Sequence, residues 1–120
     1  MRVVDSKSAH AATRALRARG ANSVVVSRGR EGLVALHGAD AFEARAPIVE
    51  GRSAVGCGDA TLAGLAVALL RGASTAQALK LAVACGSANC MASAPGRLDR
   101  RHLEQALAAT EVGRIDEALA

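Results

Sequence analysis

Apolar and polar positions follow two different periods in the first part of this chain. Residues 6–19 place alanines and Leu16 at helical spacing, with Asp5 suited to the N-cap and Gly20 to the end of a helix. Three runs that are rich in β-branched or alternating apolar residues then predict strands, the first of them buried on both faces. The predicted strands are 23–26, 33–36 and 41–45, joined by a glycine-bearing loop at 27–32 and a turn at 37–40.

The second part of the chain predicts helices. Residues 60–70 carry no charge and follow Asp59, which indicates a buried helix over 59–70 that ends at Gly72. Ser74 and Gln77 form a capping box for the next helix, and Asp99 suits the N-cap of a last one. We expect residues 110–120 to form a frayed or loosely packed helix.

Two glycines and an acid stand where the uncharged helix begins. Gly56 and Gly58 flank a single residue, and Asp59 follows directly. Glycines allow a tight turn and close approach of a ligand to the backbone. The first amides of a helix have no partner inside the helix, so together with the helix dipole they form a seat for an anion such as phosphate. Because a carboxylate repels phosphate, we expect Asp59 to take part in chemistry beside one.

Residues 55–64, Val-Gly-Cys-Gly-Asp-Ala-Thr-Leu-Ala-Gly, resemble the C-terminal signature of the PfkB/ribokinase-like carbohydrate kinases. The form is most similar to the sugar-phosphate branch, which includes 1-phosphofructokinases and tagatose-6-phosphate kinases. The resemblance implies that Gly56, Cys57 and Gly58 form the anion hole for the transferring phosphoryl group. It also implies that Asp59 is the base that accepts the proton of the acceptor hydroxyl. Cys57 departs from the family pattern, where Ala or Ser is usual.

The resemblance extends to the loop at 27–32. From the residues alone this segment is a hairpin loop between two strands. In the family, an S/T-x-G-x-x-G element that follows a strand lines the ATP phosphates. Ser27, Gly29 and Gly32 match this element here, and it precedes G-x-G-D along the chain as in the family. Two arginines of the loop could assist the phosphates or could be solvated. The implied ATP-binding residues of the loop are Ser27, Arg28, Gly29, Arg30, Glu31 and Gly32.

The helix after Ser74 contains a run of small residues at 84–88, which would allow close helix packing or a flat ligand. The resemblance places Asn89 near the nucleotide, whereas the residues alone allow a polar side chain on an open helix face. Thr61 could touch phosphate or bond its own helix turn. ATP and Mg²⁺ are the implied cofactors. The resemblance also places Gly58 and Asp59 at the ATP phosphates, and no residue is predicted as a direct metal ligand.

Composition argues against several other functions. The net charge of +4 is dispersed and Phe42 is the sole aromatic residue, so no stacking platform for nucleic acid is expected. The uncharged run before Arg71 is too short to span a membrane. Polar residues at positions 5, 7 and 10 interrupt any leader peptide. The three cysteines, Cys57, Cys85 and Cys90, lack zinc-site spacing and are expected as buried free thiols of a cytoplasmic protein.

The sequence therefore predicts an α/β chain over residues 1–120, the C-terminal part of a ribokinase-like α/β/α fold with short strands followed by three packed helices. The resemblance covers only the C-terminal part of a family kinase, so we expect the lid, the N-terminal substrate-binding residues and an N-x-x-E element to lie outside these residues. The implied function is ATP-dependent phosphorylation of a sugar or sugar-phosphate hydroxyl, and we expect these 120 residues to be a fragment that is inactive alone. The alternative is a non-catalytic module that binds nucleotide or pairs with a partner. An open sheet edge would favour a homo-oligomer or a complementary N-terminal chain.

Overall fold

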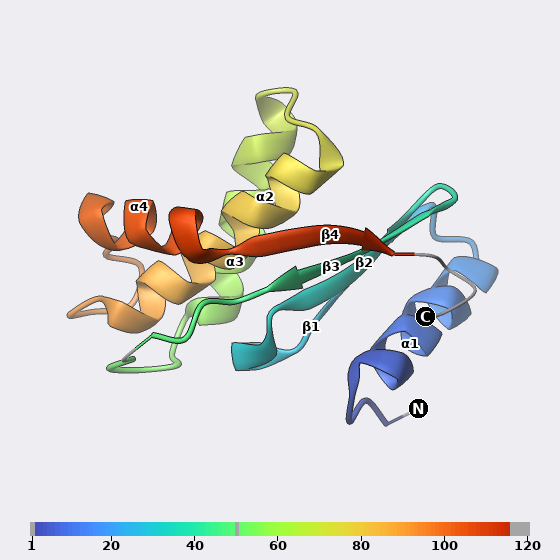
Figure 1. Cartoon of the computed structure of the whole chain (residues 1–120), viewed down its shortest axis with the longest axis horizontal. Helices are drawn as coiled ribbons and strands as arrows, with labels where there is room; N and C mark the ends of the chain where they lie inside the picture. Colours follow the sequence, from blue (N-terminus) through green and yellow to red (C-terminus); the bar gives the residue numbers. More distant parts are fainter. Residues whose placement is uncertain (1, 50, 116–120) are drawn as a thin grey trace.

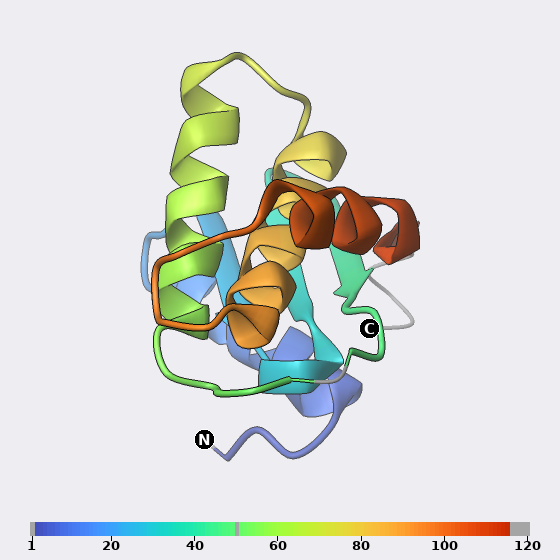
Figure 2. The same ribbon diagram turned by 90° about the vertical axis from the view of Figure 1, so that its left-hand side faces the viewer.

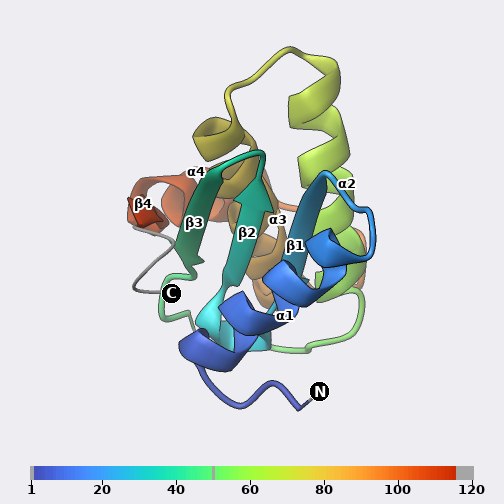
Figure 3. The same ribbon diagram turned by 90° about the vertical axis from the view of Figure 1, so that its right-hand side faces the viewer.

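The computed structural model describes residues 2–49 and 51–115 and has an α/β architecture (Figure 1). A four-stranded antiparallel sheet in the order β1-β2-β3-β4 separates α1 from the other three helices (Figures 1 and 3). In chain order the elements are α1 (Ser6–Ala18), β1 (Ser23–Ser27), the 3₁₀ turn η1 (Gly29–Glu31), β2 (Leu33–His37), β3 (Asp40–Arg45), α2 (Cys57–Leu70), α3 (Thr75–Met91), α4 (Arg100–Ala109) and β4 (Glu111–Ile115).

The core lies between the sheet and α3. Leu33 and Ala35 of β2 and Phe42 of β3 pack with Leu79 and Val83 of α3. Strand β2 is buried on both faces because α1 covers its other side. Burial of both faces was predicted for the first strand and is wrong there: β1 lies at the sheet edge, and its Val25 is 40% exposed.

Local capping signals place the helices as predicted. The Asp5 carboxylate accepts a hydrogen bond from the Ser8 amide at 2.8 Å. Ser74 and Gln77 form the expected reciprocal capping box, with bonds of 3.1 and 3.2 Å. The Asp99 carboxylate accepts from the Arg101 amide at 2.8 Å. These bonds satisfy amides that have no partner within their own helices, and they fix where α1, α3 and α4 begin.

Two predictions about the second half of the chain are wrong. Helix α2 forms but is not buried, because it packs mainly on α3 and away from the sheet (Figure 2). Only Gly64 and Ala68 of α2 are buried, whereas Leu62 is 67% and Leu70 88% exposed.

The second wrong prediction concerns the tail. Residues 111–115 form β4 rather than a helix, because the open edge of β3 pairs with them. Residues 116–120, which were expected to continue that helix, lie outside the described part of the chain. Within the described part, no helix is long and apolar enough to cross a membrane.

Candidate active site at the start of helix α2

The Gly-Cys-Gly-Asp segment forms a tight turn into α2. Gly56 is the N-cap residue with φ of 80°, a left-handed conformation that side chains disfavour. A β-carbon at Gly56 would also lie 3.4 Å from the Pro95 side chain. Gly58 has an ordinary helical backbone, and a β-carbon there would meet no atom within 4 Å. The first glycine therefore makes the turn, and the second leaves the helix start open to solvent.

The turn leaves two backbone amides unused. The Cys57 amide donates to the Ala54 carbonyl at 3.3 Å, and the Ala60 amide donates to the Gly56 carbonyl at 2.9 Å. Between them, the amides of Gly58 and Asp59 have no hydrogen-bond acceptor among the described residues. Two amides without an acceptor in the first turn of a 14-residue helix are suited to bind an anion. We call these two amides the phosphate seat.

The Asp59 carboxylate lies beside this seat. Its residue is exposed, and no hydrogen bond or ion pair within the described chain engages its side chain. A cavity of about 640 Å³ adjoins Gly56 and Asp59 and extends between α2, α3 and the start of α4. A carboxylate without a partner at the mouth of a cavity can accept a proton from a group bound there.

Thr61 belongs to the support of the turn. Its hydroxyl donates to the Cys57 carbonyl at 2.9 Å, one helical turn earlier. Of the two predicted roles, the bond within its own helix turn is the one that the structure contains.

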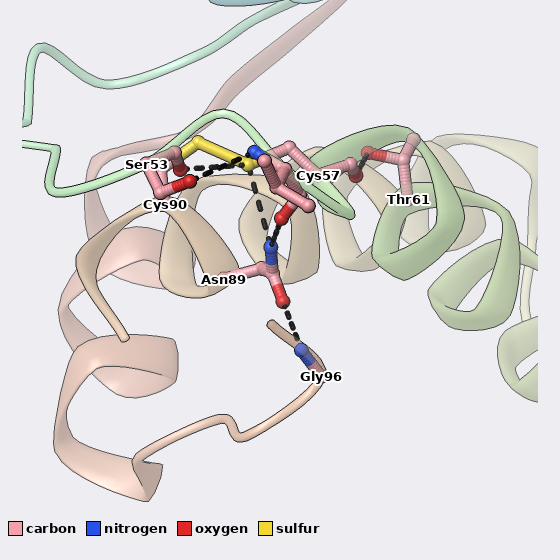
Figure 4. The surroundings of a disulfide bond; sticks show 7 residues. Ser53, Cys57, Thr61, Asn89, Cys90 and Gly96 are labelled. Atoms are coloured by element: carbon pink, nitrogen blue, oxygen red, sulfur yellow. Dashed lines mark hydrogen bonds between the residues drawn. A yellow bond between two sulfur atoms is a disulfide. The ribbon is translucent and has the colours of Figure 1, made fainter. Parts of the chain in front are cut away.

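Asn89 of α3 holds the loop at residues 53–56, which leads into the phosphate seat and which we call the seat loop (Figure 4). It is only 2% exposed, so the predicted alternative of a polar residue on an open helix face is wrong. Its amide nitrogen donates to the Val55 carbonyl at 2.9 Å, and its side-chain oxygen accepts from the Gly96 amide at 2.7 Å. Asn89 thus ties together two loops that flank the start of α2.

The cysteine prediction needs correction. Cys57 and Cys90 are joined by a disulfide across 33 residues of sequence, with their Cα atoms 6.0 Å apart (Figure 4). The pairing arises because the start of α2 crosses the last turn of α3, which the sequence spacing could not reveal. Cys85 alone is the predicted buried free thiol, and burial raises the pKa of that thiol. Cys90 is thus a site residue that sequence reasoning missed.

The 27–32 loop is a hairpin loop, as its residues predict, closed by a bond of 2.8 Å from the Arg28 amide to the Gly32 carbonyl. Gly32 is required structurally, since a β-carbon there would collide with the Ala44 carbonyl. Arg28 is not solvated: its guanidinium lies 3.9 Å from the Glu43 carboxylate and is largely buried. Arg30 is exposed.

The 27–32 loop and the turn at the start of α2 lie toward the same end of the molecule, the lower end in Figures 2 and 3. No hydrogen bond or ion pair among the described residues joins them. The structure brings together Gly56, Cys57, Gly58, Asp59 and Asn89, and the 27–32 loop makes no hydrogen bond or ion pair with this group. In the described ranges, no three His, Cys, Asp or Glu side chains gather where they could hold a metal ion.

Comparison with known proteins gives consistent matches. The model of the pfkB family carbohydrate kinases matches residues 3–99. The 1-phosphofructokinase of Xanthomonas campestris pv. campestris is 36% identical over 112 residues, which are 92% of this chain and 35% of that protein.

Solved structures agree with the sequence matches. A crystal structure assigned as a phosphofructokinase from Staphylococcus aureus superposes with a TM-score of 0.86 and 28% identity, over 95% of this chain and 37% of that one. Phosphofructokinase-2 from Escherichia coli, in complex with substrates and products, gives a TM-score of 0.76 and 25% identity, over 88% of this chain and 34% of that one. The chain spans about a third of the length of these relatives.

Proposed function

The chain belongs to the pfkB family of carbohydrate kinases, and on this premise we propose that it is the nucleotide-binding portion of an ATP-dependent phosphotransferase that acts on a sugar or sugar-phosphate hydroxyl. The predicted family and the ribokinase-like fold class are confirmed. The observation that carries the functional proposal is the pair of amides at Gly58 and Asp59, beside the Asp59 carboxylate, none of which has a partner among residues 2–49 and 51–115.

Phosphoryl transfer depends mainly on positioning and on stabilisation of charge. In the proposed site, the Gly58 and Asp59 amides and the α2 dipole hold the transferring phosphoryl group. Asp59 accepts the proton of the attacking hydroxyl, which approaches from the adjoining cavity. The Cys57 amide contributes less to the predicted anion hole, because it already donates to the Ala54 carbonyl.

The nucleotide side of the site rests on the 27–32 loop and Asn89. We assign the loop to the ATP phosphates, with Gly29 and Arg30 exposed to a ligand and Arg28 held by Glu43. We assign Asn89 to holding the seat loop in place, since its amide group is engaged within the protein.

Mg²⁺ fits this chain only as part of the nucleotide complex. It would be bound by the ATP phosphates, and no side chain among the described residues is assigned as its ligand. The ion would neutralise phosphate charge, and the residues of this chain would position the phosphoryl group and take up the proton.

A second candidate function is a module that binds nucleotide or a partner without catalysis. The exposed apolar residues of α2 and the open edge of β1 favour it, because such surfaces usually pair with other polypeptide. The occupant would be a complementary N-terminal chain that supplies the acceptor site, or a second copy of this chain. Under the first function, too, the isolated chain binds nucleotide but needs that partner for transfer.

The deciding experiment is calorimetric titration of the purified chain with ATP in the presence of Mg²⁺. Gly58→Val is expected to reduce the affinity by more than about tenfold, because the side chain would cover the seat amides. The variant should fold, since the space around Gly58 is empty. Gly113→Val in β4 is the matched control: its surroundings are equally empty, and it should bind like the wild type.

Equal binding by the wild type and Gly58→Val would refute the seat assignment. No binding by a folded wild-type chain would refute an autonomous nucleotide module. If binding is retained, transfer to sugar phosphates after addition of a complementary N-terminal chain separates the two candidate functions. Asp59→Asn should then abolish transfer while nucleotide affinity is maintained.

A further inference from the structure

A covalent link joins the phosphate seat to the neighbouring helix. Cys57 is the first residue of α2 and stands between the two glycines of the turn, and its disulfide partner Cys90 lies in the last turn of α3. We propose that Cys57 and Cys90 are a reversible oxidation site whose disulfide fixes the phosphate seat for nucleotide binding and whose reduction loosens it. This inference rests on the proposed function for its effect on ATP, but not for the oxidation itself.

Hydrogen bonds that do not involve the disulfide also hold the loop before the seat (Figure 4). The Cys90 carbonyl accepts from the amides of Arg52 at 2.6 Å and Ser53 at 3.3 Å. The Asn89 amide holds the Val55 carbonyl. Among the described residues, Cys57 is bonded to α3 by the disulfide and by one hydrogen bond to its sulfur, donated by the Asn89 side-chain amide at 3.4 Å. Opening the disulfide removes the covalent link between the first residue of α2 and α3, whereas the loop before the seat keeps its hydrogen bonds to Asn89 and Cys90.

The three cysteines differ in a way that favours exchange at this pair. Cys57 and Cys90 are each partly exposed, whereas Cys85 is 8% exposed. A helix N-terminus also stabilises a thiolate, the form that reacts in thiol–disulfide exchange. In the disulfide-bonded chain the Ser53 carbonyl lies 3.5 Å from the Cys57 sulfur, so a Cys57 thiol would have an acceptor close by. Both redox states are therefore accommodated without displacing a buried group.

A small disulfide, such as glutathione disulfide, is the oxidant. The Cys57 thiolate attacks one of its sulfurs, which forms a mixed disulfide and releases one thiolate. The Cys90 thiolate then attacks the Cys57 sulfur and releases the second. The two cysteine protons end on the two departing thiolates, so the cysteine pair is oxidised and one small disulfide is reduced to two thiols.

The test compares the full chain after treatment with glutathione disulfide and after treatment with a dithiol reductant. Mass spectrometry of peptides identifies the linked cysteines, and hydrogen exchange follows the amides of Cys57 and Ala60, which are hydrogen-bonded on either side of the phosphate seat. We expect a Cys57–Cys90 link, exchange at least about tenfold slower in the oxidised chain, and ATP affinity on the order of fivefold higher. Cys90→Ser should show neither response, whereas Cys85→Ser should show both.

Two results would overturn the proposal: a folded chain in which the oxidant does not link Cys57 to Cys90, or a linked chain whose Cys57 and Ala60 amides exchange at the rate of the reduced chain. Linked chains that exchange slowly but bind ATP no better would overturn the effect on nucleotide. If neither redox state binds ATP while exchange still responds, the proposed function of the isolated chain fails and the oxidation site stands. The wild-type comparison needs no variant to fold.

Discussion

Substitution of Gly86 by alanine tests how closely α2 and α3 must pack beneath the phosphate seat. A β-carbon at Gly86 would overlap the Thr61 hydroxyl and would lie 3.3 Å from the Cys57 carbonyl. Both atoms belong to the first turns of α2, and the Thr61 hydroxyl donates to that same carbonyl. The added methyl group must therefore displace the start of α2 or break this hydrogen bond.

The contributions to the free energy of unfolding can be estimated. Overpacking costs about 1–3 kcal/mol, and a lost hydrogen bond costs about 1 kcal/mol. Replacing glycine by alanine inside a helix returns roughly 0.5–1 kcal/mol. We therefore expect Gly86→Ala to destabilise the chain by about 1–3 kcal/mol. Gly58→Ala is the matched control, because its β-carbon meets no atom, and it should leave stability unchanged or slightly raise it.

A double-mutant cycle makes the test specific. With Thr61→Ala the overlapping hydroxyl is gone, and the Thr61 β-carbon itself would lie 3.7 Å from the added methyl group, an ordinary contact. Gly86→Ala should then cost less than about 0.5 kcal/mol in the Thr61→Ala background. Urea unfolding followed by circular dichroism measures all four proteins. Equal cost in both backgrounds would refute the proposed contact, as would a Gly86→Ala chain at least as stable as the wild type.

Two further predictions concern buried polar groups. Burial holds the pKa of His10 below its ordinary value of 6.5, so the unfolded chain binds this proton more readily and stability should fall as the pH drops through about 6.5. In His10→Leu the urea midpoint of unfolding should therefore change less between pH 7.5 and 5.5 than in the wild type. An equal change in the variant would show that His10 is not the cause. Asn89→Ala should cost about 1–3 kcal/mol by the same measurement, because the Gly96 amide and the Val55 carbonyl lose their partner; a neutral effect would mean that Asn89 does not hold the loops.

Local chemistry explains which parts of the fold could be predicted. The caps at Asp5, Ser74 and Asp99 involve residues two or three positions apart, so the sequence contains everything that determines them. The tight turn at Gly56 and the first-turn position of Asp59 are local in the same sense. The elements that bear the seat were therefore predictable from the residues themselves.

The failures all depend on what packs against an element. The absence of charge in α2 predicts burial only if other polypeptide covers the helix, and here α3 covers one side alone. Strand β4 forms because it pairs with the open edge of β3. No pattern in residues 110–115 indicates this pairing. The pairing of Cys57 with Cys90 depends on how α2 crosses α3. Such features are tertiary, so a single sequence does not contain a local signal for them.

The crossing of α2 and α3 also explains the small residues of α3. Gly86, Asn89 and Cys90 are spaced i, i+3 and i+4, so they share one helical face. That face meets the start of α2 through close backbone approach at Gly86, the amide bonds of Asn89 and the disulfide of Cys90. Of the two uses predicted for the small residues, close helix packing is the one that these contacts support. The geometry of the phosphate seat then depends on two adjacent helices and the loops that Asn89 ties to them, which is why we expect the seat to form in this chain even where the acceptor site requires a partner.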